Sequence, residues 1–172
     1  MDVPYANSYW VVQNRLLAGE HPSDYDDDAT LLRLEALLNA GIRTFIDLTQ
    51  DQETTSYHQM LCALAENRGT EIKVQRIAIV DRGVPSEPTL KRILDEIDLS
   101  TGAGNPVFVH CFAGIGRTGT VVGGYLRRHA LVNPGDVVTR IAKLRSGTPW
   151  RGEVSPQTSE QVQMVENWQD GA

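Results

Sequence analysis

The stretch that most constrains the fold is the apolar run at 106–110 together with the glycine-rich segment that follows it. The run reads PVFVH, and such a series of β-branched and aromatic residues predicts a buried strand. The next residues read CFAGIGRTGT and contain three glycines. A helix is expected from Arg117 to His129. The sequence therefore predicts a strand, a tight loop and a helix, with Cys111 at the carboxyl end of the strand.

The rest of the chain alternates between strand-like and helix-like patterns. Continuous or alternating apolar runs predict strands at 9–12, 15–19, 43–49 and 73–80. Apolar residues three and four apart predict helices from Asp28 to Ala40, from Thr54 to Arg68, after a cap at Ser86, after 133–136, and from a cap at Ser155-Pro156 to Trp168. This alternation predicts an α/β fold, with a central mixed sheet of about four to five strands flanked by helices on both faces.

The length and composition are those of one globular domain spanning residues 1–172, with 41% hydrophobic and 22% charged residues. The net charge of −6 does not favour nonspecific binding to nucleic acid, and no apolar run approaches the ~20 residues of a membrane span. The first residues lack the pattern of a secretory signal, and two cysteines are too few for a disulfide scaffold. We therefore expect a cytoplasmic monomer with no nucleic-acid or membrane partner.

The segment after the strand has the composition of an oxyanion site. Helix N-termini and nearby cations stabilise thiolates, so we expect Cys111 to be ionised at neutral pH. The glycines let the main-chain amides from Phe112 to Arg117 turn inward and form a nest for negative charge. The Arg117 guanidinium can also hold two oxygens of one anion in a bidentate fork. A tetrahedral phosphate in line with the sulfur fits this arrangement best.

At these residues the sequence resembles a known family. His110-Cys111, five further residues and Arg117-Thr118 match the signature of the cysteine-dependent protein phosphatases. The full string HCFAGIGRTGT is close to the version in tyrosine-specific and dual-specificity members. A nucleotide-binding P-loop would need a Gly-Lys-Ser/Thr ending, which this segment lacks. The resemblance implies a small, tyrosine-phosphatase-like fold and a hydrolase that acts on phosphorylated proteins without a metal or other cofactor.

Two further segments extend the resemblance. IAIVDRGVPS at 77–86 resembles the acid loop of the family, which implies Asp81 as the general acid and base. SPQTSEQ at 155–161 resembles the glutamine loop, which implies Gln157 for positioning water and Gln161 for contact with the substrate.

The implied reaction runs through a phosphocysteine intermediate on Cys111. Thr118 would donate its hydroxyl proton to the departing thiolate, and His110 would tune the thiol through a hydrogen bond. The residues implied to bind the phosphate are those of the loop, namely Phe112, Ala113, Gly114, Ile115, Gly116 and Arg117.

The class of phosphorylated substrate stays open on sequence alone. Ile79-Val80 stands before Asp81 where tyrosine-specific members have tryptophan, whereas the glutamine loop resembles the tyrosine-specific group. Phosphotyrosine is therefore one candidate, and phosphoserine or phosphothreonine is the other. Phe112 and Ile115 stand where phosphoinositide phosphatases carry lysines, which disfavours a polyanionic lipid head group.

Two other function classes are compatible with the loop. One is a catalytically weak module that binds phosphorylated residues, and the other is a rhodanese-like sulfurtransferase. Cys62 lies on a helical pattern and is interpreted as a small packed residue, with a redox role left open. The remaining histidines share no metal-ligand spacing: His21, His58 and His129.

Overall fold

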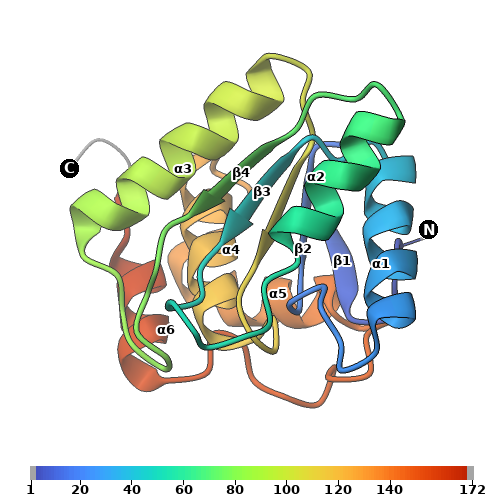
Figure 1. The fold of residues 1–172 in the computed structure, drawn as a ribbon. Coiled ribbons are helices and arrows are strands. Elements are labelled where there is room, and N and C mark those ends of the chain that lie inside the picture. Colours follow the sequence, from blue (N-terminus) through green and yellow to red (C-terminus); the bar gives the residue numbers. More distant parts are fainter. Residues whose placement is uncertain (1–2, 170–172) are drawn as a thin grey trace.

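The computed structural model describes residues 3–169 and has a five-stranded sheet. The strands are β1 (Ser8–Val12), β2 (Leu16–Gly19), β3 (Thr44–Asp47), β4 (Lys73–Arg76) and β5 (Val107–His110). They lie in the order β1-β2-β5-β3-β4, with β1 antiparallel to β2 and all other neighbours parallel (Figure 1). The predicted mixed sheet is confirmed, and the strand that leads into Cys111 is its central strand.

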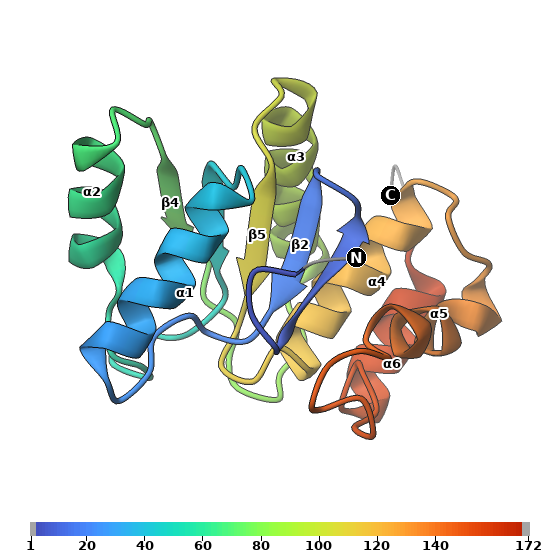
Figure 2. The same cartoon turned by 90° about the vertical axis from the view of Figure 1, so that its right-hand side faces the viewer.

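Helices cover both faces of the sheet, as predicted. They are α1 (Asp27–Asn39), α2 (His58–Asn67), α3 (Glu87–Gly102), α4 (Gly116–Arg128), α5 (Val137–Leu144), α6 (Ser159–Asn167) and a short 3-10 helix at Pro134–Asp136. α1 and α2 pack on one face, and α3 to α6 pack on the other (Figure 2). Side chains along β5 alternate between the two faces. Phe108 packs in the core under α1 and α2, whereas Val107 and Val109 pack in the core under α3 to α6.

Two predicted elements are shorter than expected. The strand predicted at 73–80 pairs with β3 only as far as Arg76, although the amide of Ile77 still donates to the carbonyl of the last residue of β3 and that of Ile79 to the carbonyl of Leu48. The helix predicted from Thr54 begins at His58. The expected first turn is a loop instead, in which the Thr54 hydroxyl lies 2.9 Å from Nε2 of His21.

The start of the last helix was also predicted wrongly. Thr158 caps α6 and forms a capping box with Gln161. Ser155 lies before this cap, and its hydroxyl instead donates a 2.7 Å hydrogen bond to the carbonyl of Ile115. The cap predicted at Ser86 is confirmed, since its hydroxyl oxygen accepts a hydrogen bond from the amide of Thr89.

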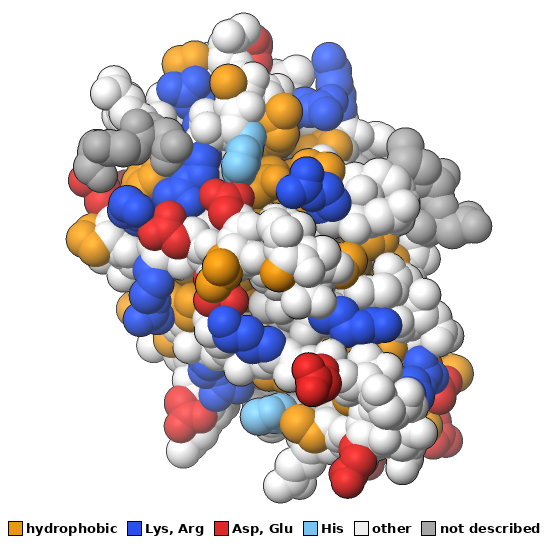
Figure 3. Space-filling model, turned by 90° about the horizontal axis from the view of Figure 1, so that it is seen from above, with side chains coloured by type: hydrophobic (Ala, Val, Ile, Leu, Met, Phe, Trp, Pro, Cys, Tyr) orange, Lys and Arg blue, Asp and Glu red, His pale blue; other side chains and the backbone are white. Residues whose placement is uncertain are grey.

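The carboxyl ends of β2, β5 and β3 meet at one edge of the sheet, at the bottom of Figures 1 and 2. Ligand sites in open α/β sheets lie beyond such an edge. The opposite end of the molecule, seen in Figure 3, carries basic and acidic side chains interspersed with one another. Within residues 3–169, no helix has the length and apolar character needed to cross a lipid bilayer.

Candidate active site

The nucleophile loop, residues 111–115, connects the central strand to α4. Cys111 is buried, with 3% of its surface exposed. Among residues 3–169, the amides of 112–117 donate none of the backbone hydrogen bonds outside the helix ladder, and no side chain caps the first turn of α4. Unused amides at the positive end of a helix dipole attract an anion. The local structure is therefore that of an oxyanion site.

The loop packs closely against the end of β2. Gly114 has a φ of +71°, and a Cβ there would lie 2.4 Å from the carbonyl carbon of Gly19. The amide of His21 donates a 2.9 Å hydrogen bond to the carbonyl of Phe112. Only glycine meets both requirements at position 114, because it adopts a positive φ readily and has no Cβ.

The loop opens into a cavity of about 220 Å³. The cavity is lined by Asp81, Arg82, Cys111, Phe112, Ala113, Ile115, Gly116, Arg117 and Gln157. It thus brings together the predicted acid, nucleophile, arginine and glutamine from three separate segments of the chain. An oxygen of Asp81 lies 3.1 Å from a guanidinium nitrogen of Arg117. Gly114 shapes the loop without lining the cavity, and Arg82 lines it without having been predicted.

Arg117 is held by a carboxylate that sequence analysis missed. Its Nη1 donates to Glu53 Oε2 at 2.8 Å and its Nη2 to Glu53 Oε1 at 2.5 Å. Nη1 also donates to the carbonyl of Ile79 at 3.2 Å. Burial would lower the pKa of Arg117, but the hydrogen bonds and charge of Glu53 outweigh it and raise that pKa. The same bonds hold the pKa of Glu53 below its usual range.

Thr118 follows Arg117 in the first turn of α4 and is fully buried. Within residues 3–169 its hydroxyl oxygen has no hydrogen-bond partner. Buried hydroxyls are nearly always bonded, so an unsatisfied one beside a candidate nucleophile calls for an explanation. Donation to the Cys111 sulfur would provide it, and this role stays a prediction.

The two glutamines of the predicted glutamine loop have different positions. Gln157 lines the cavity, as expected. Gln161 is fully buried, and its Oε1 accepts hydrogen bonds from the amides of Gln157 and Thr158. Its Nε2 donates a 2.8 Å bond to the carbonyl of Gly83 in the acid loop. The amide group of Gln161 thus links the acid loop to the glutamine loop and does not line the cavity, and its contact with substrate stays a prediction.

His110 lies behind the nucleophile in a buried network. Its Nε2 is 2.8 Å from the Tyr57 hydroxyl, and its Nδ1 is 3.3 Å from the carbonyl oxygen of Cys111. Burial lowers the pKa of His110 and raises that of Tyr57, so both are neutral at pH 7. If Tyr57 donates to Nε2, the Nδ1 proton is directed at the Cys111 carbonyl. This geometry agrees with an orienting role for His110.

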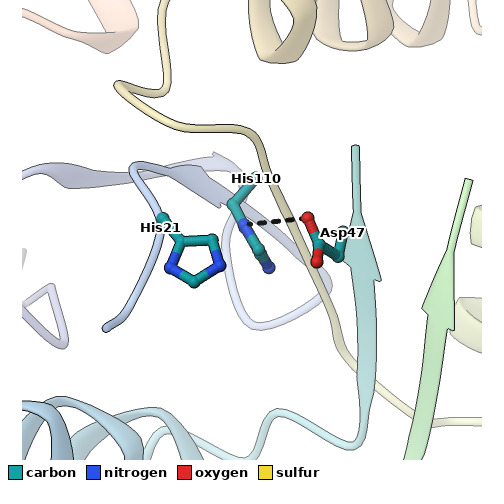
Figure 4. Close-up of side chains that lie close together, drawn as sticks. All are labelled: His21, Asp47 and His110. Carbon is teal, nitrogen blue, oxygen red and sulfur yellow. Dashed lines mark ion pairs between the residues drawn. The ribbon is translucent and has the colours of Figure 1, made fainter. Parts of the chain in front are cut away.

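His21, Asp47 and His110 form the one group among residues 3–169 whose side chains could converge on a metal ion (Figure 4). Their ligand atoms lie within 4.8 Å of one another. Each side chain already has partners in the protein, however. Asp47 accepts two hydrogen bonds from Thr49 and forms an ion pair with Arg76. Burial opposes the charge on Asp47, but His110 and Thr49 outweigh it and lower its pKa. The cluster is therefore explained as a hydrogen-bonded network.

Comparison with known families agrees with this geometry. A family model described as "Polymorphic toxin system, DSP-PTPase phosphatase" matches residues 24–130, well over half of the chain. The match includes both the acid loop and the nucleophile loop. The chain belongs to this phosphatase family.

Curated relatives of the phosphatase match over parts of their length. The chain is 38% identical to "Dual specificity protein phosphatase CDC14AB" of Danio rerio over 69 residues, which is 40% of this chain and 11% of that protein. It is 30% identical over 112 residues to "Phosphatidylglycerophosphatase and protein-tyrosine phosphatase 1" of Rattus norvegicus, 64% of this chain and 56% of the rat protein. The chain thus matches between a tenth and just over half of these two relatives.

Solved structures of phosphatases share the fold. The structure of Tk-PTP in its active form superposes with a TM-score of 0.72 at 20% identity, covering 98% of this chain and 99% of that one. Kinase associated phosphatase superposes with a TM-score of 0.70 at 18% identity, covering 94% and 91%. The predicted tyrosine-phosphatase-like fold is confirmed.

Proposed function

We propose that this phosphatase hydrolyses phosphotyrosine in proteins, with phosphoserine and phosphothreonine as further substrates. The observation that carries the proposal is the convergence of Cys111, Arg117, Asp81 and Gln157 on one cavity of about 220 Å³. Phosphoryl transfer is catalysed mainly by positioning and by stabilisation of charge on the phosphoryl oxygens. The unused amides of the loop and the Arg117 guanidinium supply that stabilisation.

In the first step, the sulfur of Cys111 attacks phosphorus. An S–P bond forms, and the bond from phosphorus to the leaving oxygen breaks. Asp81 gives its proton to that oxygen, so that an alcohol or phenol departs. The position of Asp81 supports this role, because its side chain lines the cavity and lies beside Arg117 on the solvent side.

In the second step, water attacks the phosphocysteine. An O–P bond forms, the S–P bond breaks, and the Asp81 carboxylate accepts the proton from water. Gln157 positions this water from the cavity wall. The Thr118 hydroxyl is buried and makes no hydrogen bond within residues 3–169, so it is available to donate to the departing thiolate.

A second hollow favours an aromatic phosphate ester. This hollow, of about 550 Å³, adjoins the phosphate cavity and shares Phe112 and Ala113 with it. Its lining includes the exposed rings of Tyr25, Phe112 and Trp150. Aromatic rings pack favourably against one another, so a phenyl phosphate can place its ring against Phe112 while its phosphate occupies the loop.

The test is hydrolysis of p-nitrophenyl phosphate and of matched phosphotyrosine, phosphoserine and phosphothreonine peptides. We expect turnover by the wild type, none by Cys111→Ser, and a covalent phosphoenzyme that can be trapped by rapid denaturation. Asp81→Asn should slow phenyl phosphate far more than p-nitrophenyl phosphate, because only the poorer leaving group needs the proton. Absence of turnover on every phosphoester, or full activity of Cys111→Ser, would contradict the proposal.

Two further assays test for activities other than protein dephosphorylation. The name of the rat relative includes a phospholipid substrate, so phosphatidylglycerophosphate is assayed beside the peptides. Faster hydrolysis of this lipid than of any phosphopeptide would replace the protein substrate in the proposal. Transfer of sulfur from thiosulfate to cyanide tests the sulfurtransferase alternative. Tight binding of phosphopeptides without turnover would indicate a binding module.

A further inference from the structure

His21 connects three parts of the active site without lining the phosphate cavity. It follows β2, is 5% exposed, and its main-chain amide bonds the nucleophile loop at Phe112. Its ring stands edge-on to His110, with the ring centroids 5.0 Å apart and the planes at 85° (Figure 4). Its Nε2 lies 2.9 Å from the hydroxyl of Thr54. One side chain therefore touches the nucleophile's histidine and the segment next to Glu53.

We propose that His21 is a positioning residue for Arg117, acting through Thr54 and the adjoining Glu53. The inference rests on the proposed function, since it assigns a supporting role within the same phosphate site. Two features support this role, namely the contacts that hold the segment between β3 and α2 and the hydrogen bonds of the His21 ring.

The segment at 48–57 has no helix or strand of its own. Glu53 reaches from it to Arg117. On the opposite side the segment is anchored at Thr54 by His21 and at Thr55, whose carbonyl accepts a 2.9 Å hydrogen bond from Ser23. A further anchor, the ion pair of Asp51 with Arg76, is largely exposed and therefore weak. Glu53 also accepts a 2.8 Å hydrogen bond from the amide of Gln50, and its neighbour Thr54 is held by the largely buried ring of His21.

The His21 ring is neutral and has a defined orientation. Its pKa is lowered to about 3 by burial and by the neighbouring His110. Both ring nitrogens have partners, because Nδ1 lies 3.2 Å from the amide nitrogen and 2.6 Å from the hydroxyl of Ser23, and Nε2 lies 2.9 Å from the hydroxyl of Thr54. Removing the ring takes away the hydrogen bond to the residue next to Glu53. The Glu53 carboxylate is then held less firmly against Arg117.

Two substitutions at His21 separate the effect of the aromatic ring from the effect of its hydrogen bond to Thr54. His21→Phe keeps an aromatic edge against His110 but cannot hydrogen-bond to Thr54. His21→Gln lacks the ring but places an amide group, which can donate or accept, near the position of Nε2. Thr54→Val removes the same bond from its other end and replaces His21→Phe if that variant does not fold. His129→Gln is the matched control, because His129 pairs with Asp98 beyond the far end of α4.

The measurements are affinity for tungstate by calorimetry, kcat and KM for p-nitrophenyl phosphate, and thermal stability. We expect His21→Phe and Thr54→Val to weaken tungstate binding and to raise KM by about fivefold to tenfold, the size of one lost hydrogen bond. His21→Gln should recover affinity to within about threefold of wild type. In a Glu53→Gln background, His21→Phe should cause little further loss, because its path to Arg117 is already broken.

Several results would overturn the inference. Unchanged tungstate affinity in His21→Phe together with a lower Tm would make His21 a packing residue only. Independent, additive losses in the double variant, or a His21→Gln variant no better than His21→Phe, would remove the route through Glu53. Wild type that binds tungstate without hydrolysing phosphoesters defeats the proposed function alone and leaves the His21 test intact. Wild type that does not bind tungstate defeats both.

Discussion

The contact between Glu53 and Arg117 offers a direct test of how the phosphate site is built. Glu53→Gln keeps the shape of the side chain and removes its charge. The Arg117 side chain is 2% exposed, whereas that of Glu53 is 20% exposed. Removing one partner of a fully buried ion pair costs about 3–5 kcal/mol. The glutamine retains one acceptor, and Asp81 remains 3.1 Å from the Arg117 guanidinium. We therefore expect the free energy of unfolding to fall by about 1.5–3 kcal/mol, the range for a hydrogen bond to a charged group.

The expected loss can be read from thermal unfolding. In a domain of this size each kcal/mol corresponds to about 2–4 °C in Tm, so Glu53→Gln should melt roughly 3–12 °C below wild type at pH 7. The bond lowers the folded pKa of Glu53 below its unfolded value. The stabilisation that this bond gives the folded state is therefore complete above the unfolded pKa of ~4.3, and it is lost as the pH falls through the folded pKa.

The assay is circular dichroism melting of both proteins from pH 7 to well below the ordinary glutamate pKa of ~4.3, at low and high salt. The two melting curves should converge in acid, because the wild-type carboxylate is then protonated and resembles the glutamine. Equal Tm values at pH 7, or a difference that persists unchanged as Glu53 protonates, would refute the reasoning. Glu66→Gln on the exposed surface of α2 serves as the control for loss of one negative charge.

Other predictions test the remaining parts of the site. Arg117→Lys should lower kcat/KM by about a hundredfold or more in the p-nitrophenyl phosphate assay, because a lysine cannot form the bidentate fork. Thr118→Val should slow hydrolysis of the phosphocysteine more than its formation, which rapid-quench kinetics would detect as a larger burst; an unchanged burst would remove the hydroxyl from the second step. Gly114→Ala should lower the free energy of unfolding by about 1–3 kcal/mol in urea titrations, because alanine strains the positive φ and its Cβ overlaps Gly19.

Sequence analysis could predict the parts of the site that adjoin a regular pattern. The apolar run at 106–110, the glycines and the following helix place Cys111 and Arg117 in one short stretch, so their proximity needs no long-range information. Asp81 and Gln157 were placed by resemblance of short loops. Glu53 could not be found in this way, because it is one of two acidic residues in an irregular segment that matches no motif. Its role arises only when β3 and β5 become neighbours in the sheet.

The errors at the last helix have a physical cause that was visible in the sequence. Ser155-Pro156 has the composition of a helix start, but the hydroxyl of Ser155 is used by the carbonyl of Ile115. The TSEQ string at 158–161 is itself a capping box, in which a threonine is followed three residues later by a glutamine. Giving that pattern greater weight would have placed Gln161 in the first turn of α6, with its side chain in the capping box.

The buried amide of Gln161 also bears on how short an active version of this enzyme could be. The carbonyl of Gly83 in the acid loop depends on a residue from the last helix for its hydrogen bond. A truncated protein ending before α6 would still contain Cys111 and Arg117, yet its acid loop would lose its anchor. Such a protein should still bind oxyanions but protonate poor leaving groups slowly, which makes the C-terminal helix a requirement for turnover.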